Sequence, residues 1–155
     1  MTQRITSIDD LTKQIGNELR VGPWHELTQA EVDNFSRLSG EDHWIHTDSD
    51  EARNSRFGGP IAQGTLLLSM APALLRGGVG TEVDLGAKFG LNYGFNKVRF
   101  ISPVAVGQKI RARLKLVNVH EVAPNVYQIV WQRTIEIDGE AKPAMVAEAI
   151  SQQYL

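Results

Sequence analysis

The segment from Ile61 to Leu75 constrains this chain more than any other part of its sequence. It reads IAQGTLLLSMAPALL, and its leucine, methionine and alanine residues favour a helix. Apolar residues fall on every side of such a helix, so no face is left for water and we expect the helix to be buried. Pro72 should bend the helix or mark its last turns. The segment is too short to span a bilayer as a helix.

After a glycine-rich stretch, the period of the sequence changes to two. Residues 109–116 alternate charged and apolar side chains, which predicts a half-buried antiparallel strand with the even positions inward. Residues 127–137 keep this period on a second strand, and Asp138-Gly139 is a strong hairpin signal. Two more strands are expected over residues 92–100 and 144–153.

One buried helix followed by a meander of long strands is most simply explained by a curved sheet wrapped around the helix. The sequence therefore predicts the α+β class, with a single hot-dog fold over residues 1–155 and a polar N-terminal segment over 1–15. A cystatin-like cone is the alternative, although its helix is usually amphipathic. The strands over 92–100 and 144–153 are candidates for sheet edges, and pairing of such an edge with a second chain predicts a homodimer.

The first third of the chain carries local helix signals. Residues 17–27 predict a short opening strand, and Thr28 to Glu31 matches a capping box at the start of a helix. Ser39-Gly40 ends that helix, and a polar loop over residues 41–49 follows. A short helix after this loop can be capped by Ser49 or by the residue before it.

The composition is that of an ordinary globular domain. The chain has 155 residues, of which 42% are hydrophobic and 22% are charged. It has no cysteine, which excludes disulfides, thiolate metal sites and a cysteine nucleophile. The net charge is −2 and the 16 lysine and arginine residues are scattered, so no nucleic-acid partner is expected. With a polar, acidic start to the sequence, we expect a cytoplasmic protein without a membrane partner.

The loop over residues 41–49 concentrates groups that can carry chemistry. His43 and His46 lie there with several carboxylates and with Trp44. No metal is predicted, because the spacing matches no familiar ligand set. A solvated acidic loop is the plainer interpretation. Just before the apolar segment, Gly64 begins the expected helix, where a backbone N–H lacks an intrahelical partner and could serve as an oxyanion-hole donor.

A resemblance to a known family adds to this interpretation. The residues from Ser39 to His46, SGEDHWIH, resemble the signature of the MaoC-like dehydratases, particularly their nodulation-protein-N-like branch. The match continues in order through residues 50–52, 57–64, 91–100, 102–107 and 142–148. It covers most of the chain from Gly16 onward.

The resemblance implies a hot-dog dimer that hydrates trans-2-enoyl-CoA thioesters to (R)-3-hydroxyacyl thioesters in fatty-acid metabolism, without a cofactor. The family's catalytic pair is an aspartate followed five residues later by a histidine. The histidine falls on His46, and counting back gives Glu41, with Asp42 one residue closer. Glu41 is therefore the first choice for the catalytic carboxylate and Asp42 the second. The family's Ala-His-Gly before the central helix is Ala62-Gln63-Gly64 in this chain.

The implied chemistry needs a base for water, a proton for C2 and a donor for the thioester oxygen. A carboxylate and an imidazole that hold one water can supply the first two. Gly64 N–H is the expected donor. The residues expected to contact the substrate are Gln63, Trp44, Asn92, Tyr93 and Asn96. Two alternatives stay open: a thioesterase on the same fold, and a non-catalytic protein that binds acyl thioesters.

Overall fold

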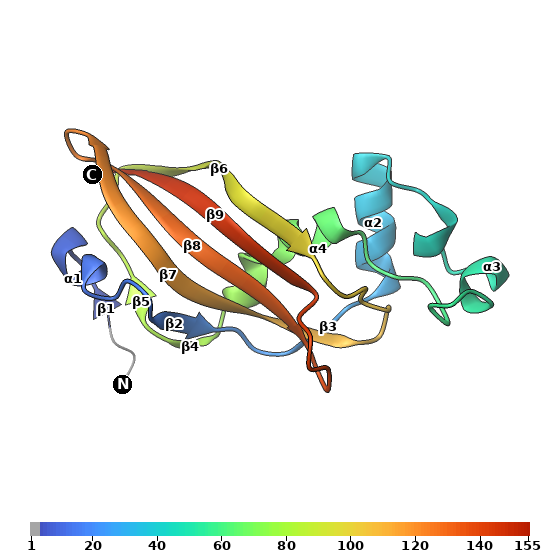
Figure 1. Ribbon diagram of the computed structural model, residues 1–155. Helices are drawn as coiled ribbons and strands as arrows, with labels where there is room; N and C mark the ends of the chain where they lie inside the picture. Colours follow the sequence, from blue (N-terminus) through green and yellow to red (C-terminus); the bar gives the residue numbers. More distant parts are fainter. Residues whose placement is uncertain (1–3) are drawn as a thin grey trace.

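A computed structural model describes residues 4–155, and a curved antiparallel sheet dominates it (Figure 1). The order of its strands is β4-β2-β7-β8-β9-β6, and β3 also pairs with β7. The strand bounds are β2 Glu18–Val21, β3 His25–Glu26, β4 Val79–Gly80, β6 Phe89–Phe100, β7 Lys109–Ala123, β8 Val126–Ile137 and β9 Met145–Tyr154. A separate parallel pair consists of β1 (Arg4–Ile5) and β5 (Glu82–Val83).

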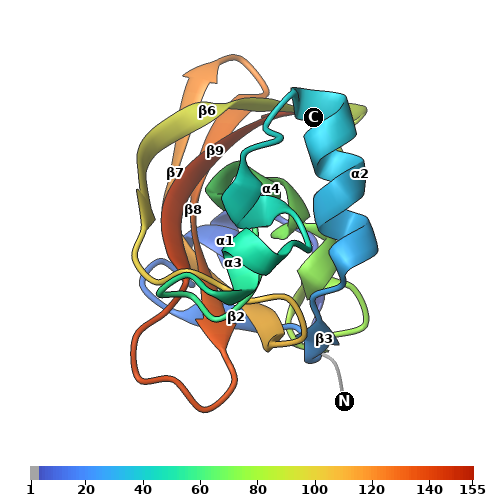
Figure 2. The ribbon, with the colours of Figure 1, turned by 90° about the vertical axis from the view of Figure 1, so that its right-hand side faces the viewer.

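Helix α4 lies on the concave side of the sheet, whereas α2 and α3 lie at one end of the molecule and α1 lies at the other (Figure 1). Their bounds are α1 Ile8–Thr12, α2 Gln29–Ser39, α3 Asp50–Arg53 and α4 Gly64–Met70, with short 3-10 helices η1 (Trp44–His46) and η2 (Ala73–Leu75). Figure 2 shows α4 between the sheet and α2. The expected hot-dog arrangement, a sheet curved around a central helix, is confirmed.

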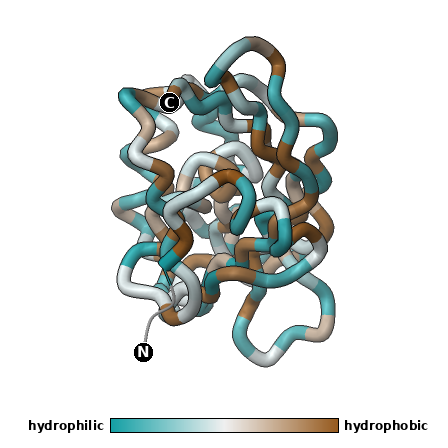
Figure 3. The backbone as a smooth tube through the Cα atoms, turned by 90° about the vertical axis from the view of Figure 1, so that its left-hand side faces the viewer, coloured by the Kyte–Doolittle hydropathy of each residue, from teal (hydrophilic) through white to brown (hydrophobic). Residues whose placement is uncertain are grey.

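The period-two pattern of residues 109–116 forms a half-buried strand, as predicted. On β7 the even positions Ile110, Ala112 and Leu116 are fully buried, and their charged neighbours face outward. Figure 3 shows the resulting alternation of hydrophobic and hydrophilic residues along the long strands. The turn between β7 and β8 contains Asn125 at a φ of 59°, a left-handed conformation that asparagine tolerates better than most residues.

The central helix is shorter than the apolar segment suggested. It ends at Met70, and Pro72, which lacks a backbone N–H, begins the separate helix η2. Leu66 and Leu67 are buried, but Thr65 and Ser69 are exposed, so the helix buries one side and not every side.

The opening strand is split into β2 and β3. At the break, Gly22 passes so close to η2 that an added Cβ would lie 1.8 Å from the carbonyl oxygen of Leu74. Only glycine fits there, and the sheet can therefore approach the backbone of η2.

One expectation about the sheet edges is wrong. The strand expected over residues 144–153 is β9, and it lies between β8 and β6, paired along most of its length on both sides. Its neighbour β6 lies at one edge of the sheet, and within the described residues it pairs with β9 alone. Alternation along a strand shows which of its side chains face the core, but it does not show which strands lie beside it. The sequence alone therefore could not tell which of the two strands is at the edge.

The polar N-terminal segment contributes to a second apolar cluster. Ile5 and Leu11 are buried against Leu19, Leu116 and Trp131. Residues 1–3 of that segment lie outside the described residues. The larger cluster lies beneath α4 and includes Leu67, Ile135 and Met145 among its members.

The capping box at the start of α2 is present as predicted. The Thr28 hydroxyl accepts from the Glu31 N–H at 3.3 Å, and Glu31 Oε2 accepts from the Thr28 N–H at 2.9 Å. Burial opposes ionisation of Glu31, but the hydrogen bonds from Thr28 and from His25 outweigh it, so the pKa of Glu31 lies below its ordinary value.

We expect Glu31→Ala to lower the free energy of unfolding by about 1 kcal/mol near neutral pH. Because the folded-state pKa is depressed, this contribution is present above the unfolded pKa and is lost as the pH falls through the folded one. Urea unfolding of both proteins from about pH 7 to about pH 3 measures it. Glu140→Ala, which changes an exposed loop carboxylate, is the control. If the difference in unfolding free energy between wild type and Glu31→Ala stays constant down to acid pH, the ionised carboxylate of Glu31 is not what stabilises the start of α2.

Candidate active site

His46 is fixed in one tautomer by the chain that precedes α4. The residue is 9% exposed, and its Nδ1 donates to the carbonyl oxygen of Ile61 at 2.8 Å. The Ile61 N–H in turn donates to the carbonyl oxygen of Ile45 at 2.9 Å. Because the carbonyl can only accept, Nδ1 carries the hydrogen and Nε2 of the neutral ring keeps a free lone pair. The imidazole can therefore take a proton at Nε2.

The backbone of His46 is held from α2. The Gln29 side-chain amide donates to the His46 carbonyl oxygen at 2.9 Å and to Asp33 Oδ1 at 2.9 Å. The capping box begins α2 one residue before Gln29, so the local helix signal also sets the position from which this amide reaches His46.

Gln63 joins the start of α4 to α2 and to the loop. It is 1% exposed, and its Nε2 lies 2.8 Å from Ser36 Oγ, 3.2 Å from the Val32 carbonyl oxygen and 3.3 Å from the Glu41 carbonyl oxygen. Ser36 Oγ also donates to the same Glu41 carbonyl oxygen at 2.8 Å. The amide is thus directed at α2 and the loop, where it fixes the backbone of Glu41.

The carboxylate of Glu41 reaches the first turn of α4. Its Oε1 accepts a hydrogen bond of 2.7 Å from the hydroxyl of Thr65, the residue after Gly64. Asp42 is exposed, and its side chain has no hydrogen bond or ion pair among residues 4–155. Glu41 is exposed as well, but of the two candidate carboxylates it is the one that contacts the helix start.

A pocket of about 340 Å³ opens beside this helix start. It places His46 and Gly64 on one surface with apolar side chains around them. The lining residues are Ile45, His46, Arg56, Phe57, Ile61, Ala62, Gly64, Leu67, Phe100, Ile101, Ser102, Pro103 and Val104. A largely apolar pocket with a few convergent polar groups is the usual form of a small-molecule site.

Gly64 is required by the close approach of β6. A Cβ added to Gly64 would lie 2.8 Å from Cγ and Cδ2 of Phe100. The Gly64 N–H has no hydrogen-bond partner within residues 4–155, and its residue lines the pocket. It can therefore donate to a ligand oxygen, as the sequence predicted for an oxyanion-hole donor.

The other residues expected to contact substrate lie away from this pocket. Trp44 is half-buried in η1 with its ring against His43. Asn92 and Tyr93 are exposed on β6, and the amide of Asn96 lies 3.4 Å from Glu148 Oε2. None of these four lines the pocket that contains His46.

Several residues of the site carry no chemical signal that the sequence analysis used. Ser36, Thr65 and Phe100 act through a hydroxyl or a ring that becomes relevant only when α2, α4 and β6 are packed together. Helical spacing does place Ser36 one turn from Val32, which faces the core, and that is the only hint available.

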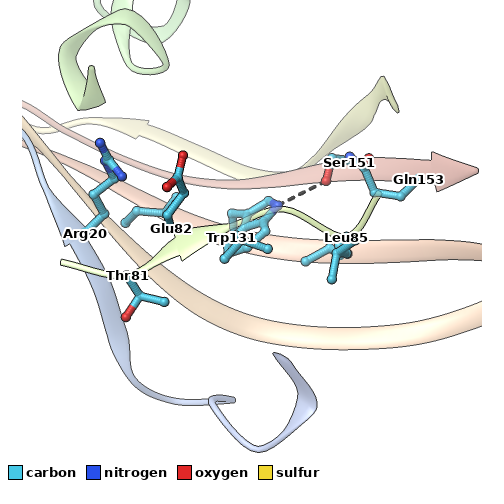
Figure 4. Close-up of a pocket in the computed structure, with 10 residues that line it drawn as sticks. Arg20, Thr81, Glu82, Leu85, Trp131, Ser151 and Gln153 are labelled. Carbon is cyan, nitrogen blue, oxygen red and sulfur yellow. Dashed lines mark hydrogen bonds between the residues drawn. The ribbon is translucent and has the colours of Figure 1, made fainter. Parts of the chain in front are cut away.

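A second cavity, of about 300 Å³, lies at the far end of the concave face (Figure 4). Arg20, Glu82 and Gln153 are at its rim, and Trp131 donates to Ser151 Oγ at 3.0 Å within it. It shares no lining residue with the pocket of His46. The two cavities therefore occupy different parts of the molecule, and His46 and Gly64 belong to the one at the start of α4.

The described residues contain neither a cluster of metal ligands nor a helix that could span a membrane. Over residues 4–155, no group of three or more His, Cys, Asp or Glu side chains could hold a metal ion. Within the same part of the chain, no helix is long and apolar enough to cross a membrane.

Comparison with known proteins identifies the family. Residues 10–136 match the MaoC-like domain. The chain is 38% identical over 144 residues to 3-hydroxyacyl-thioester dehydratase Z of Mycobacterium tuberculosis, covering 93% of each protein. It is 32% identical to nodulation protein N of Rhizobium meliloti, covering 94% of this chain and 89% of that one.

Comparison with solved structures supports the same family and fold. The (R)-hydratase of A. caviae involved in PHA biosynthesis superimposes with a TM-score of 0.69 at 26% identity, covering 88% of this chain and 94% of that one. A monoamine oxidase regulatory protein from Archaeoglobus fulgius gives 0.79 at 22% identity, over 100% and 99% of the two chains, and supports the fold alone. The fold is that of the hot-dog hydratases. The chain belongs to the MaoC-like dehydratase family.

We expect Gly64→Ala to destabilise the protein by about 1–3 kcal/mol, because the new methyl group displaces the Phe100 ring. In a Phe100→Ala background the same change should cost much less, and the double-mutant cycle measures this coupling by urea unfolding. Gly59→Ala is the control, since an added Cβ there meets nothing within 4 Å. Additive effects of the two substitutions would show that the Phe100 ring is not the cause of the destabilisation by Gly64→Ala.

Proposed function

We propose that this chain adds water reversibly to trans-2-enoyl thioesters and forms (R)-3-hydroxyacyl thioesters. The observation that carries the proposal is the buried His46, held through Nδ1 and lining one pocket with the unpartnered Gly64 N–H. The names of the relatives, a 3-hydroxyacyl-thioester dehydratase and an (R)-hydratase, support the same reaction. CoA as the carrier, a role in fatty-acid metabolism and a cytoplasmic location are parts of the proposal that follow from this substrate class.

The reaction makes a C3–O bond and a C2–H bond from one water molecule. Water needs a base when it attacks C3, and Nε2 of His46 or the carboxylate of Glu41 accepts its proton. The electron pair of the double bond moves toward the thioester oxygen, where the Gly64 N–H stabilises the developing negative charge. The proton then goes to C2, so the acid–base pair returns to its starting charge.

Thr65 gives the glutamate a defined position in this scheme. Glutamate has one more rotatable bond than the family's aspartate, and its water would be poorly placed if the side chain were free. The hydrogen bond from the Thr65 hydroxyl and the two bonds to the Glu41 backbone carbonyl hold both ends of the residue. These contacts favour Glu41 over Asp42 as the catalytic carboxylate.

The carboxylate assignment predicts unequal effects of two similar substitutions. We expect Glu41→Gln and His46→Gln to lower kcat about 10²- to 10⁴-fold, because each removes a proton-transfer group. Asp42→Asn should stay close to wild type. Thr65→Val should lower kcat with little effect on KM, and Thr65→Ser should restore it. Loss of turnover in Asp42→Asn alone would reassign the base.

The assay that measures these rates also separates hydration from thioester hydrolysis. Crotonyl-CoA is incubated with the protein, and loss of enoyl absorbance and release of free thiol are both followed. Hydration without thiol release is expected. Thiol release would indicate a thioesterase, whereas binding of the thioester without turnover would indicate a non-catalytic acyl-binding protein.

We also propose that the active assembly is a homodimer formed along β6. This edge strand leaves large apolar side chains in solvent, among them Leu91 at 53% and Tyr93 at 62% exposure. An unpaired edge with such side chains is a surface that proteins usually cover. Pairing of β6 with its copy in a second chain would continue the sheet and bury them.

Sedimentation equilibrium should give about 34 kDa, twice the 17.2 kDa of one chain. Leu91→Glu should shift the mass toward that of one chain, because it places a charge in the proposed interface. Val122→Glu is a matched control, since Val122 is 46% exposed on a strand away from β6. If both variants sediment like wild type, the interface does not lie along β6.

A further inference from the structure

Arg133 occupies an inward position on β8 where its neighbours are apolar. Ile135 belongs to the core beneath α4, and Trp131 belongs to the second apolar cluster. Arg133 lies between them on the same face, as the period of a strand requires. A long cation at the junction of two apolar clusters is unusual, because burying a charge is costly unless it is paired.

The guanidinium of Arg133 has no ion-pair partner within residues 4–155. Two nearby arginines, Arg111 and Arg113, each pair with Glu136. Arg133 makes no ion pair in that range, and its Nε is buried without a hydrogen-bond partner. Burial lowers the pKa of Arg133 from its ordinary value. Arg133 as a whole is half-buried, and no hydrogen bond or ion pair within the described part of the chain offsets the desolvation of its Nε.

The guanidinium lines a pocket of about 220 Å³ between α4 and β6. Leu68 and Ser69 of α4 form one wall, and Asn92 and Phe95 of β6 form another. Ser69 Oγ donates its hydrogen to the Thr65 carbonyl oxygen at 2.9 Å, so the exposed amide of Asn92 is the side-chain donor that accompanies the cation. The space is enough for about seven water-sized groups, given roughly 30 Å³ for each.

This pocket lies further along α4 and β6 than the one that contains His46, and the two share no lining residue. Leu67 and Phe100 line the first pocket, and Leu68 and Phe95 of the same two elements line the second. The seven residues of α4 span about 10 Å from end to end. A medium-length acyl group whose thioester oxygen meets the Gly64 N–H and which follows α4 therefore ends near Arg133.

We propose that Arg133, with Asn92, forms a subsite for an anionic group on the thioester substrate, namely a carboxylate at the far end of the acyl chain. The inference rests on the proposed hydratase function and specifies its substrate class. A planar carboxylate matches the donor fork of a guanidinium, and it would provide the partner that the chain itself does not. A phosphate of CoA is the other source of the same chemistry. A pocket with the volume of about seven water-sized groups, however, holds a carboxylate more readily than a nucleotide.

The test compares two saturated thioesters that bind but cannot be hydrated, octanoyl-CoA and octanedioyl-CoA, by isothermal titration calorimetry. We expect wild type to bind the dicarboxylic thioester about tenfold to a hundredfold more tightly. Arg133→Met should abolish this preference and leave octanoyl-CoA binding nearly unchanged, while Arg133→Lys should keep part of it. Arg99→Met removes a cation from β6 outside this pocket and should have no effect.

Three controls identify the origin of any effect. Arg133→Met should melt at the wild-type temperature or above it, because it removes a partly buried cation that has no ion-pair partner among residues 4–155. Crotonyl-CoA turnover reports on the proposed hydratase function separately, so failure of that function and failure of the subsite give different results. The N-acetylcysteamine thioesters of both acids lack the CoA phosphates, and the preference should persist with them.

Three results would overturn the proposal. Wild type could bind both thioesters equally. Arg133→Met could weaken both CoA thioesters alike and neither N-acetylcysteamine thioester, which would assign Arg133 to a phosphate of CoA. Finally, Arg133→Met could alter only the sedimentation behaviour, which would assign its partner to a second copy of the chain.

Discussion

The buried amide of Gln63 is the contact on which the rest of the site depends. It lies at the start of α4, and its Nε2 is within hydrogen-bonding distance of Val32 and Ser36 in α2 and of the backbone of Glu41. A buried amide is costly unless it is hydrogen-bonded, so these partners must remain in place for the fold to be stable. The same requirement keeps the loop with Glu41 and His46 against the helix start. One side chain thereby links the stability of the core to the geometry of the proposed acid–base pair.

Local signals predicted local structure well. The alternation over residues 109–116 became a strand with Ile110 and Ala112 inward, and Thr28 with Glu31 formed the capping box. Each of these features depends on residues a few positions apart, so it can be recognised before the chain is folded. Strand order is different, because the place of β9 inside the sheet depends on long-range pairing that alternation does not encode.

In the candidate site, too, local motifs identified some residues, whereas other contacts depend on tertiary packing. The loop motif located His46, and the glycine at the expected helix start located Gly64; both line one pocket. The direction of the Gln63 amide and the contact of Thr65 with Glu41 depend on how α2, α4 and the loop pack together. Side-chain direction at such junctions is set by tertiary packing, so residue type alone indicates that an amide or hydroxyl is present and not what it meets. Arg133 stands at an inward position of the period-two pattern of β8, but only the packing of α4, β6 and β8 shows that its guanidinium lines a pocket and has no ion-pair partner within residues 4–155.

Phe100 belongs to two parts of the molecule at once. Its ring meets Gly64 in the wall of the pocket, yet it is also the last residue of β6, the free edge of the sheet, and it is 49% exposed. A second chain that paired along β6 would press on this ring and so change the width of the pocket. Substrate selectivity in this protein could then evolve through substitutions on its outer edge, without any change in the residues that perform the chemistry.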